Sequence, residues 1–184
     1  MEFAIEFAKT KVKVYAQRNQ TDQKKIVMDC YYSKLAEFAA WKYLTDFMPN
    51  HPQYKPIGQP CIKVLERPNW DADLKNEKYK FAVKSVTKSM ADYFGTSWTF
   101  NLRPPDKLLS ISDANYKVMF VITHSENKFI IYGASHSQAL KASGAYMFED
   151  GVDLAKLKGI KLFVKADKVE DGVIRKIGQE ILIP

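Results

Sequence analysis

Two aspartates and one lysine form the part of this sequence with the clearest capacity for chemistry. Asp71 and Asp73 lie in the segment WDADL, and Lys84 follows in the apolar run FAVKS. Carboxylate oxygens are the ligands that hard divalent cations prefer. A bound cation and a nearby ammonium group both favour attack of water on a phosphate ester, because they stabilise the negative charge that develops there. Residues 70–101 are therefore predicted to carry a metal-dependent phosphodiester site.

A predicted hairpin positions these groups. A strand is expected to begin at residues 71–74, a polar turn at residues 76–77 follows, and a second strand is predicted over residues 79–85. Because alternate side chains of a strand share one face, Ala82 and Lys84 should lie on one face and Val83 on the other. The main-chain carbonyl of Val83, just before the lysine, is then a candidate metal ligand.

The clearest helix is predicted over residues 28–48, which are rich in Ala, Leu, Glu and Lys and are followed by Pro49. On a helical wheel, at about 100° per residue, Glu37 falls between Ala40 and Leu44, off the solvated face. Burial of a bare carboxylate costs on the order of several kcal/mol, so Glu37 needs a partner, a hydrogen bond or a metal. The alternative is that Glu37 lies at the rim of the helix and pairs with a lysine.

The remaining pattern predicts a mixed α/β (α+β) fold. Residues 17–25 read as a polar loop, and Trp98 is expected to be a core anchor because of the area it can bury. Further strands and short helices complete a single domain over residues 1–184 with a mixed sheet. The expected strands are 61–66, 97–101, 116–123, 129–134 and 161–165, and the expected short helices are 86–94, 138–142, 152–158 and 171–177.

Composition limits the class of protein. The chain has 184 residues, of which 46% are hydrophobic, enough for one domain with a real core. The net charge of +7 fits a nucleic-acid partner but does not establish one. No apolar stretch is long enough for a membrane span, and Glu2 and Glu6 stand where a signal peptide has basic residues, which predicts a cytoplasmic protein. Cys30 and Cys61 fit no metal-binding spacing and are expected to be buried thiols.

Four segments carry a resemblance to a known family: YYSKLAEFAAWKYL with its embedded Glu37, WDADL, FAVKS and SWTFN. Together they resemble the PD-(D/E)XK, or restriction-endonuclease-like, nuclease superfamily, and in particular its small phage and bacterial members. The resemblance covers about residues 28–134 and leaves residues 135–184 as an accessory C-terminal region. It implies an α-β-β-β-α-β core, with a central mixed sheet flanked by helices, and cleavage of DNA with Mg²⁺ or Mn²⁺ in a bacterial cell or a phage-infected host.

The resemblance also implies roles for individual residues. Asp73 and Glu37, with the carbonyl of Val83, would hold the metal, and Lys84 would orient or activate the attacking water. The catalytic residues would thus be Asp73, Lys84 and Glu37. Asp71 is the second choice as a ligand, because the spacing of WDADL puts both acids on one face of a strand.

One departure from the family pattern matters for activity. The family has an acid two residues before the lysine, and this chain has Ala82 there. Glu37 is the natural substitute, and Glu77 in the turn is a weaker one. If neither reaches the metal, the protein would be a catalytically inactive nucleic-acid-binding protein on the same fold. A phage protein-interaction factor is a further alternative.

Polar residues flanking the site are predicted to contact DNA phosphates, which would make binding strongly salt-dependent. The alternative for them is an ordinary solvated face. The sequence leaves open whether two copies pair as a homodimer to cut both DNA strands. The predicted DNA-binding residues are Lys75, Lys78, Lys80, Ser85 and Lys88.

Overall fold

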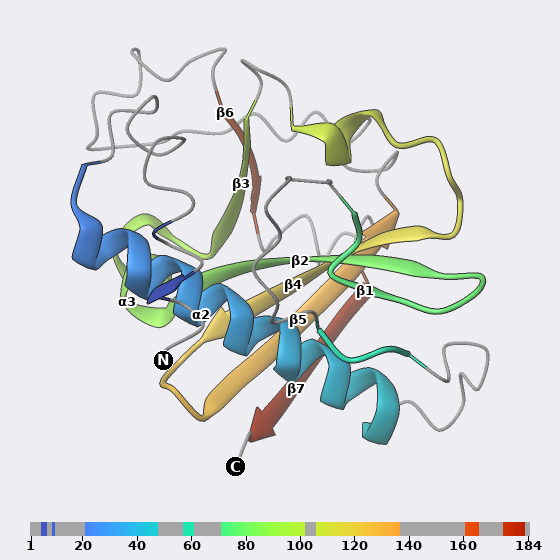
Figure 1. The fold of residues 1–184 in the computed structure, drawn as a ribbon, viewed down its shortest axis with the longest axis horizontal. Helices are drawn as coiled ribbons and strands as arrows, with labels where there is room; N and C mark the ends of the chain where they lie inside the picture. Colours follow the sequence, from blue (N-terminus) through green and yellow to red (C-terminus); the bar gives the residue numbers. More distant parts are fainter. Residues whose placement is uncertain are drawn as a thin grey trace.

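The computed structural model describes residues 5–6, 9, 21–47, 57–60, 71–101, 106–136, 161–165 and 175–182. A five-stranded sheet in the order β1-β2-β4-β5-β7 forms the centre of the fold (Figure 1). Strands β2 and β4 are parallel, and the other neighbouring strands are antiparallel. Its strands are β1 (Leu74–Lys75), β2 (Lys80–Thr87), β4 (Tyr116–Thr123), β5 (Lys128–His136) and β7 (Arg175–Leu182). The expected mixed sheet in an α and β protein is thereby confirmed.

Helix α2 (Gln23–Lys42) crosses one face of this sheet and continues as a π-helical turn, Tyr43–Phe47 (Figure 1). Helix α3 (Lys88–Phe94) follows β2 directly. Strands β3 (Ser97–Asn101) and β6 (Lys161–Lys165) form a separate antiparallel pair, and a 3₁₀ helix, Lys107–Ser110, precedes β4. The long helix and the parallel β2–β4 pair are the elements that position the candidate site.

Helix α2 begins earlier than the sequence pattern predicts. The side chain of Asp22 accepts a hydrogen bond from the Lys25 amide at 3.0 Å, which caps the first turn. Residues 23–25, expected in a loop, are therefore helical. Ala36, Ala39 and Ala40 are fully buried, and their small side chains allow the helix backbone to lie close to the sheet.

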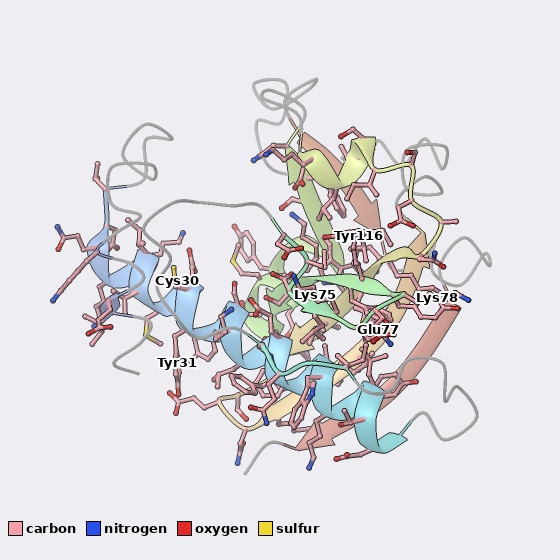
Figure 2. The ribbon with its side chains drawn as sticks, turned by 45° about the vertical axis from the view of Figure 1, so that its right-hand side comes forward. Cys30, Tyr31, Lys75, Glu77, Lys78 and Tyr116 are labelled. Atoms are coloured by element: carbon pink, nitrogen blue, oxygen red, sulfur yellow. The ribbon has the colours of Figure 1, made fainter. Side chains whose placement is uncertain are left out.

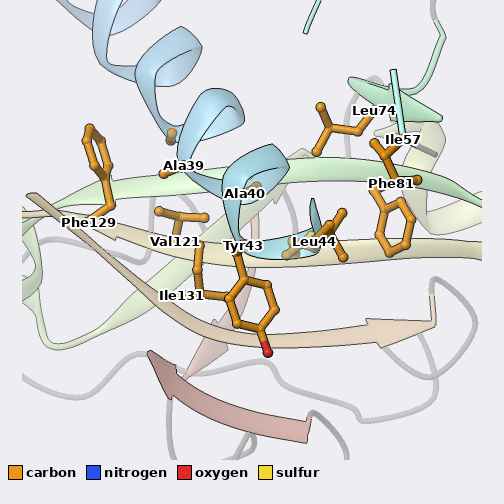
Figure 3. Packing of buried hydrophobic residues seen from close by; sticks show 12 residues of the cluster. Ala39, Ala40, Tyr43, Leu44, Ile57, Leu74, Phe81, Val121, Phe129 and Ile131 are labelled. Atoms are coloured by element: carbon orange, nitrogen blue, oxygen red, sulfur yellow. The ribbon is translucent and has the colours of Figure 1, made fainter. Parts of the chain in front are cut away.

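Two hydrophobic clusters fill the two faces of the sheet. The first lies under α2 and joins Leu44 of the π-helical turn to Phe81, Val121 and Ile131 of the sheet (Figure 3). The second lies on the other face, where Trp98 and Phe100 of β3 pack against Phe120 of β4. Strand β4 is buried along its length, as expected for a central strand covered on both faces.

Trp98 is the core anchor that the sequence predicts. It is 2% exposed, its Nε1 donates to the Val121 carbonyl at 3.1 Å, and its ring packs against Phe120 and Tyr132. Replacing Trp98 with alanine should lower the free energy of unfolding by about 3–5 kcal/mol, because it leaves a large cavity and removes the hydrogen bond to the Val121 carbonyl. Urea denaturation followed by circular dichroism measures this change. Trp41→Phe, at a half-buried position, is the control, and equal losses in the two variants would contradict the assignment.

The C-terminal strand corrects one prediction. Residues 175–177, expected in a short helix, belong to β7, which pairs antiparallel with β5. Pairing with an available sheet edge overrides the weak local preference for helix. The end of α3 is confirmed at Gly95, which has a positive φ of 78°.

The described residues do not include all the elements of the expected α-β-β-β-α-β core. Between α2 and α3 the structure describes two strands, β1 and β2, and the third strand expected, 61–66, lies outside the described residues. The helices expected at 138–142 and 152–158 also lie outside them. Among the helices that the structure describes, none has the length and apolar character needed to cross a membrane.

Candidate functional site

Asp73 lies at the edge of the sheet, just before the short strand β1. Because β1 spans only Leu74–Lys75 and pairs with residues 80–81, it does not extend along the rest of β2. The Asp73 side chain reaches this part of β2, where its Oδ2 accepts a hydrogen bond from the Val83 amide at 2.7 Å. Burial raises the pKa of Asp73, and the Val83 amide and the charges of Lys34 and Lys84 oppose this rise.

Glu37 approaches the same point from helix α2. It is 8% exposed, and its Oε2 lies 2.5 Å from the ammonium nitrogen of Lys34. Burial and then the negative charge of Asp73 raise the pKa of Glu37 to about 8, although Lys34 opposes the rise. The negative charge of Asp73 therefore acts on Glu37. Glu37 does pair with a lysine, as the alternative required, but it is buried rather than at the rim.

Lys84 lies on the face of β2 opposite to Val83 and helix α2, as the alternation of side chains along a strand predicts. Ala82 packs into the cluster around Trp98, whereas Val83 packs under α2. The ammonium nitrogen of Lys84 lies 2.7 Å from Oδ2 of Asp106 and 4.8 Å from the centre of the Phe100 ring. Its charge also acts on Asp73. Asp73 thus interacts electrostatically with members of two ion pairs. These are Lys34–Glu37 on the helix side and Lys84–Asp106 on the other face of β2.

Tyr116 shows how closely the acids gather at this end of the sheet. It is buried at the start of β4 (Figure 2). Burial raises the pKa of its hydroxyl, and the charges of Asp73, Asp71 and Asp106 raise it further. The charges of three aspartates, Asp73, Asp71 and Asp106, therefore act on one buried hydroxyl at this end of the sheet.

Asp71 is placed less well than Asp73 to act as a ligand. Its carboxylate accepts hydrogen bonds from the Lys75 ammonium and from the Ala72 amide, and more than half of its side chain is exposed. The bond from Lys75 is the main reason that the pKa of Asp71 is lowered. Residues 71–73 precede β1, so the expectation that Asp71 and Asp73 share a strand face was wrong. Glu77 is exposed in the turn, whereas Glu37 is buried beside Asp73.

The lysines predicted to contact DNA lie mainly on exposed surface. Lys75 pairs with Asp71, Lys80 pairs with Asp113 at 3.7 Å, and Lys88 pairs with Asp92. Lys78, near the turn between β1 and β2 (Figure 2), lies 5.3 Å from the centre of the Tyr79 ring, and Ser85 is half-buried. Exposed ion pairs contribute only about 0–1 kcal/mol, so these ammonium groups could exchange a carboxylate for a phosphate at small cost.

Two residues in the site were not predicted from the sequence. Lys34 was not singled out, although it lies three residues before Glu37, a spacing at which side chains on a helix meet. Asp106 had no comparable local signal. It lies 22 residues beyond Lys84 in the chain, and only the return of the chain past β3 brings the two together.

The donor set is suited to a hard cation. In the described part of the chain, no group of three or more His, Cys, Asp or Glu side chains could hold a metal. Magnesium needs less than this, since proteins often hold it through one or two carboxylates and leave the other positions to water and phosphate oxygens. Glu37 and Asp73 are two carboxyl groups that could hold a cation in this way.

The fold and site together define an α and β protein in which the charge of Asp73 acts on Glu37 and in which Lys84 is paired with Asp106. Comparisons of the chain with family models, with curated proteins and with solved structures gave no match. The case for a function is accordingly built on the residues of the site.

Proposed function

We propose that the protein is a Mg²⁺-dependent DNA endonuclease with a restriction-endonuclease-like core. The observation that carries this proposal is that Asp73, which accepts a hydrogen bond from the Val83 amide at the edge of β2, lies within electrostatic range of both Glu37 and Lys84, although the three residues come from separate elements. A missing acid at Ala82 would disable the site only if no other carboxylate replaced it. Glu37, whose pKa is raised in part by the charge of Asp73, would be the replacing carboxylate.

Asp73 and Glu37 would hold the cation, with the Val83 carbonyl as a further ligand. The Val83 amide already points to Asp73, and the N–H and C=O of one strand residue project from the same strand edge, so its carbonyl faces the same side. When bound, Mg²⁺ supplies positive charge that polarises a phosphate and lowers the pKa of a coordinated water.

Lys84 contributes a fixed positive charge on the other side of Asp73. Its ammonium group can donate hydrogen bonds to an attacking water and to a phosphate oxygen, and so orient one toward the other. Lys75, Lys78, Lys80 and Lys88 would hold the flanking DNA phosphates, with Ser85 as a further hydrogen-bonding group.

Incubation of the purified protein with supercoiled plasmid tests the proposal. We expect nicked and linear DNA with Mg²⁺ or Mn²⁺, no cleavage with EDTA, and a rate at least about a hundredfold lower for Lys84→Ala. Salt-sensitive DNA binding without cleavage would instead support an inactive DNA-binding protein. Failure to retain DNA even at low salt would support a protein-interaction factor.

Metal binding should also depend on pH. Because carboxylate ligands must be deprotonated and the pKa of Glu37 is about 8, Mn²⁺ should stabilise the protein more at pH 9 than at pH 6. At a hundred times its dissociation constant, a ligand adds about 2.7 kcal/mol of stability, which corresponds to several degrees in Tm. Thermal denaturation with Mn²⁺ or EDTA measures the difference. An equal shift at both pH values would argue against Glu37 as a ligand.

A further inference from the structure

Asp106 forms an ion pair with Lys84, the candidate catalytic lysine, and no sequence motif predicts this contact. Its side chain is 14% exposed, and its Oδ2 accepts from the Lys84 ammonium at 2.7 Å. We propose that Asp106 is a positioning residue that fixes the ammonium group of Lys84 at the site. Its catalytic meaning rests on the proposed nuclease function, but its contact with Lys84 can be tested separately.

The Asp106 carboxylate is itself held in one orientation. Its Oδ1 accepts from the Leu108 amide at 3.1 Å, which caps the 3₁₀ helix, and its own amide donates to the Asn101 carbonyl at 2.8 Å. Leu108 and Leu109 are buried in the cluster around Trp98 and anchor that helix. Because Oδ1 accepts the hydrogen bond from the Leu108 amide, the carboxylate cannot rotate freely. The direction in which Oδ2 accepts from Lys84 is therefore restricted.

Lys84 needs such a partner because its side chain is long and flexible. An unrestrained lysine has up to about 2 kcal/mol of rotamer entropy to lose when it is fixed. On the same face of β2, Ala82 offers only a methyl group, so the residue two positions before Lys84 cannot orient the lysine. The Phe100 ring lies 4.8 Å from the ammonium nitrogen and supports it from one side, and Asp106 fixes its end.

Asp106→Asn should separate positioning from simple support of the fold. Asparagine keeps an oxygen for the Leu108 amide but lacks the negative charge that holds Lys84. A misplacement of about 1 Å can cost on the order of a hundredfold in rate, so kcat should fall about 10- to 100-fold. KM should stay within about twofold, because flanking lysines hold most of the DNA. In a Lys84→Ala background, Asp106→Asn should have little further effect.

Asp113→Asn is the matched control. Asp113 accepts from the Asn115 amide at 2.9 Å and pairs with Lys80 of the same strand at 3.7 Å, so it resembles Asp106 in chemistry. Both variants should keep a Tm close to that of the wild type, and only Asp106→Asn should lower kcat. Asp106→Glu should recover part of the rate if its longer side chain reaches Lys84.

A second measurement does not need cleavage. Under limiting acetylating reagent, Lys84 should react at least about threefold faster relative to Lys80 in Asp106→Asn than in the wild type, because the Lys84 side chain, partly buried while it is paired with Asp106, becomes more accessible to the reagent when that ion pair is lost. Mass spectrometry of peptides measures this ratio. If the wild type cleaves DNA and Asp106→Asn cleaves equally fast, the positioning role is overturned. If the wild type does not cleave DNA, the nuclease proposal fails. In that case an unchanged acetylation ratio also overturns the positioning role of Asp106, whereas a raised ratio supports the contact between Asp106 and Lys84.

Discussion

Replacement of Asp73 by asparagine should lower the rate of plasmid nicking at least about a hundredfold, equal to about 2.7 kcal/mol of activation free energy. Asparagine is the informative substitution, because its carbonyl oxygen can still accept the hydrogen bond from the Val83 amide. The edge of β2 should therefore keep its geometry while the site loses the charge that binds the cation. Affinity for DNA, measured without metal, should be equal or slightly higher, since a negative charge near the phosphates is removed.

Asp71→Asn is the matched control for this prediction. Asp71 lies two residues away, is exposed and pairs with Lys75, so its loss should change the nicking rate less than about threefold, as for other surface ion pairs. A larger loss of activity in Asp71→Asn than in Asp73→Asn would transfer the ligand role to Asp71. A circular dichroism spectrum and Tm for each variant would show that the comparison concerns folded protein.

Glu37→Gln should make the protein more stable at alkaline pH while abolishing the stabilisation by Mn²⁺. The pKa of Glu37 is raised from 4.5 to about 8 by burial and by the charge of Asp73. Between these values the folded protein keeps a proton on Glu37 that the unfolded chain has released, so the free energy of unfolding falls as pH rises. At about 1.4 kcal/mol per pKa unit, the loss for the wild type reaches roughly 5 kcal/mol by pH 9.

Urea denaturation between pH 4 and pH 9 measures this effect as the difference between Glu37→Gln and the wild type. The two stabilities should be similar near pH 4 and should diverge above it, because glutamine has no proton to lose. Glu77→Gln, in the exposed turn, is the control and should follow the wild type. Parallel curves for Glu37→Gln and the wild type would refute a buried, protonated Glu37. Glu37 thus lowers the stability of the folded protein at neutral pH, which is consistent with a functional role for this residue.

Local patterns were sufficient to predict several elements. Strands 97–101, 116–123 and 161–165 have the predicted bounds, because alternating or continuous apolar residues between polar turns define them locally. The helical wheel also placed Glu37 correctly among apolar neighbours. The start of α2 at Gln23 was missed, because the residues after Asp22 are polar and resemble a loop.

The sequence by itself determined the alternation along β2, the burial of Glu37 on its helix and the position of Asp73 near the start of a strand. These features depend on residues within a few positions of each other, where spacing fixes direction. The tertiary structure alone decided that Asp73 reaches the Val83 amide, that β7 joins the sheet, and that Asp106 holds Lys84. Such contacts depend on how distant segments return to each other, and local periodicity carries no information about that path.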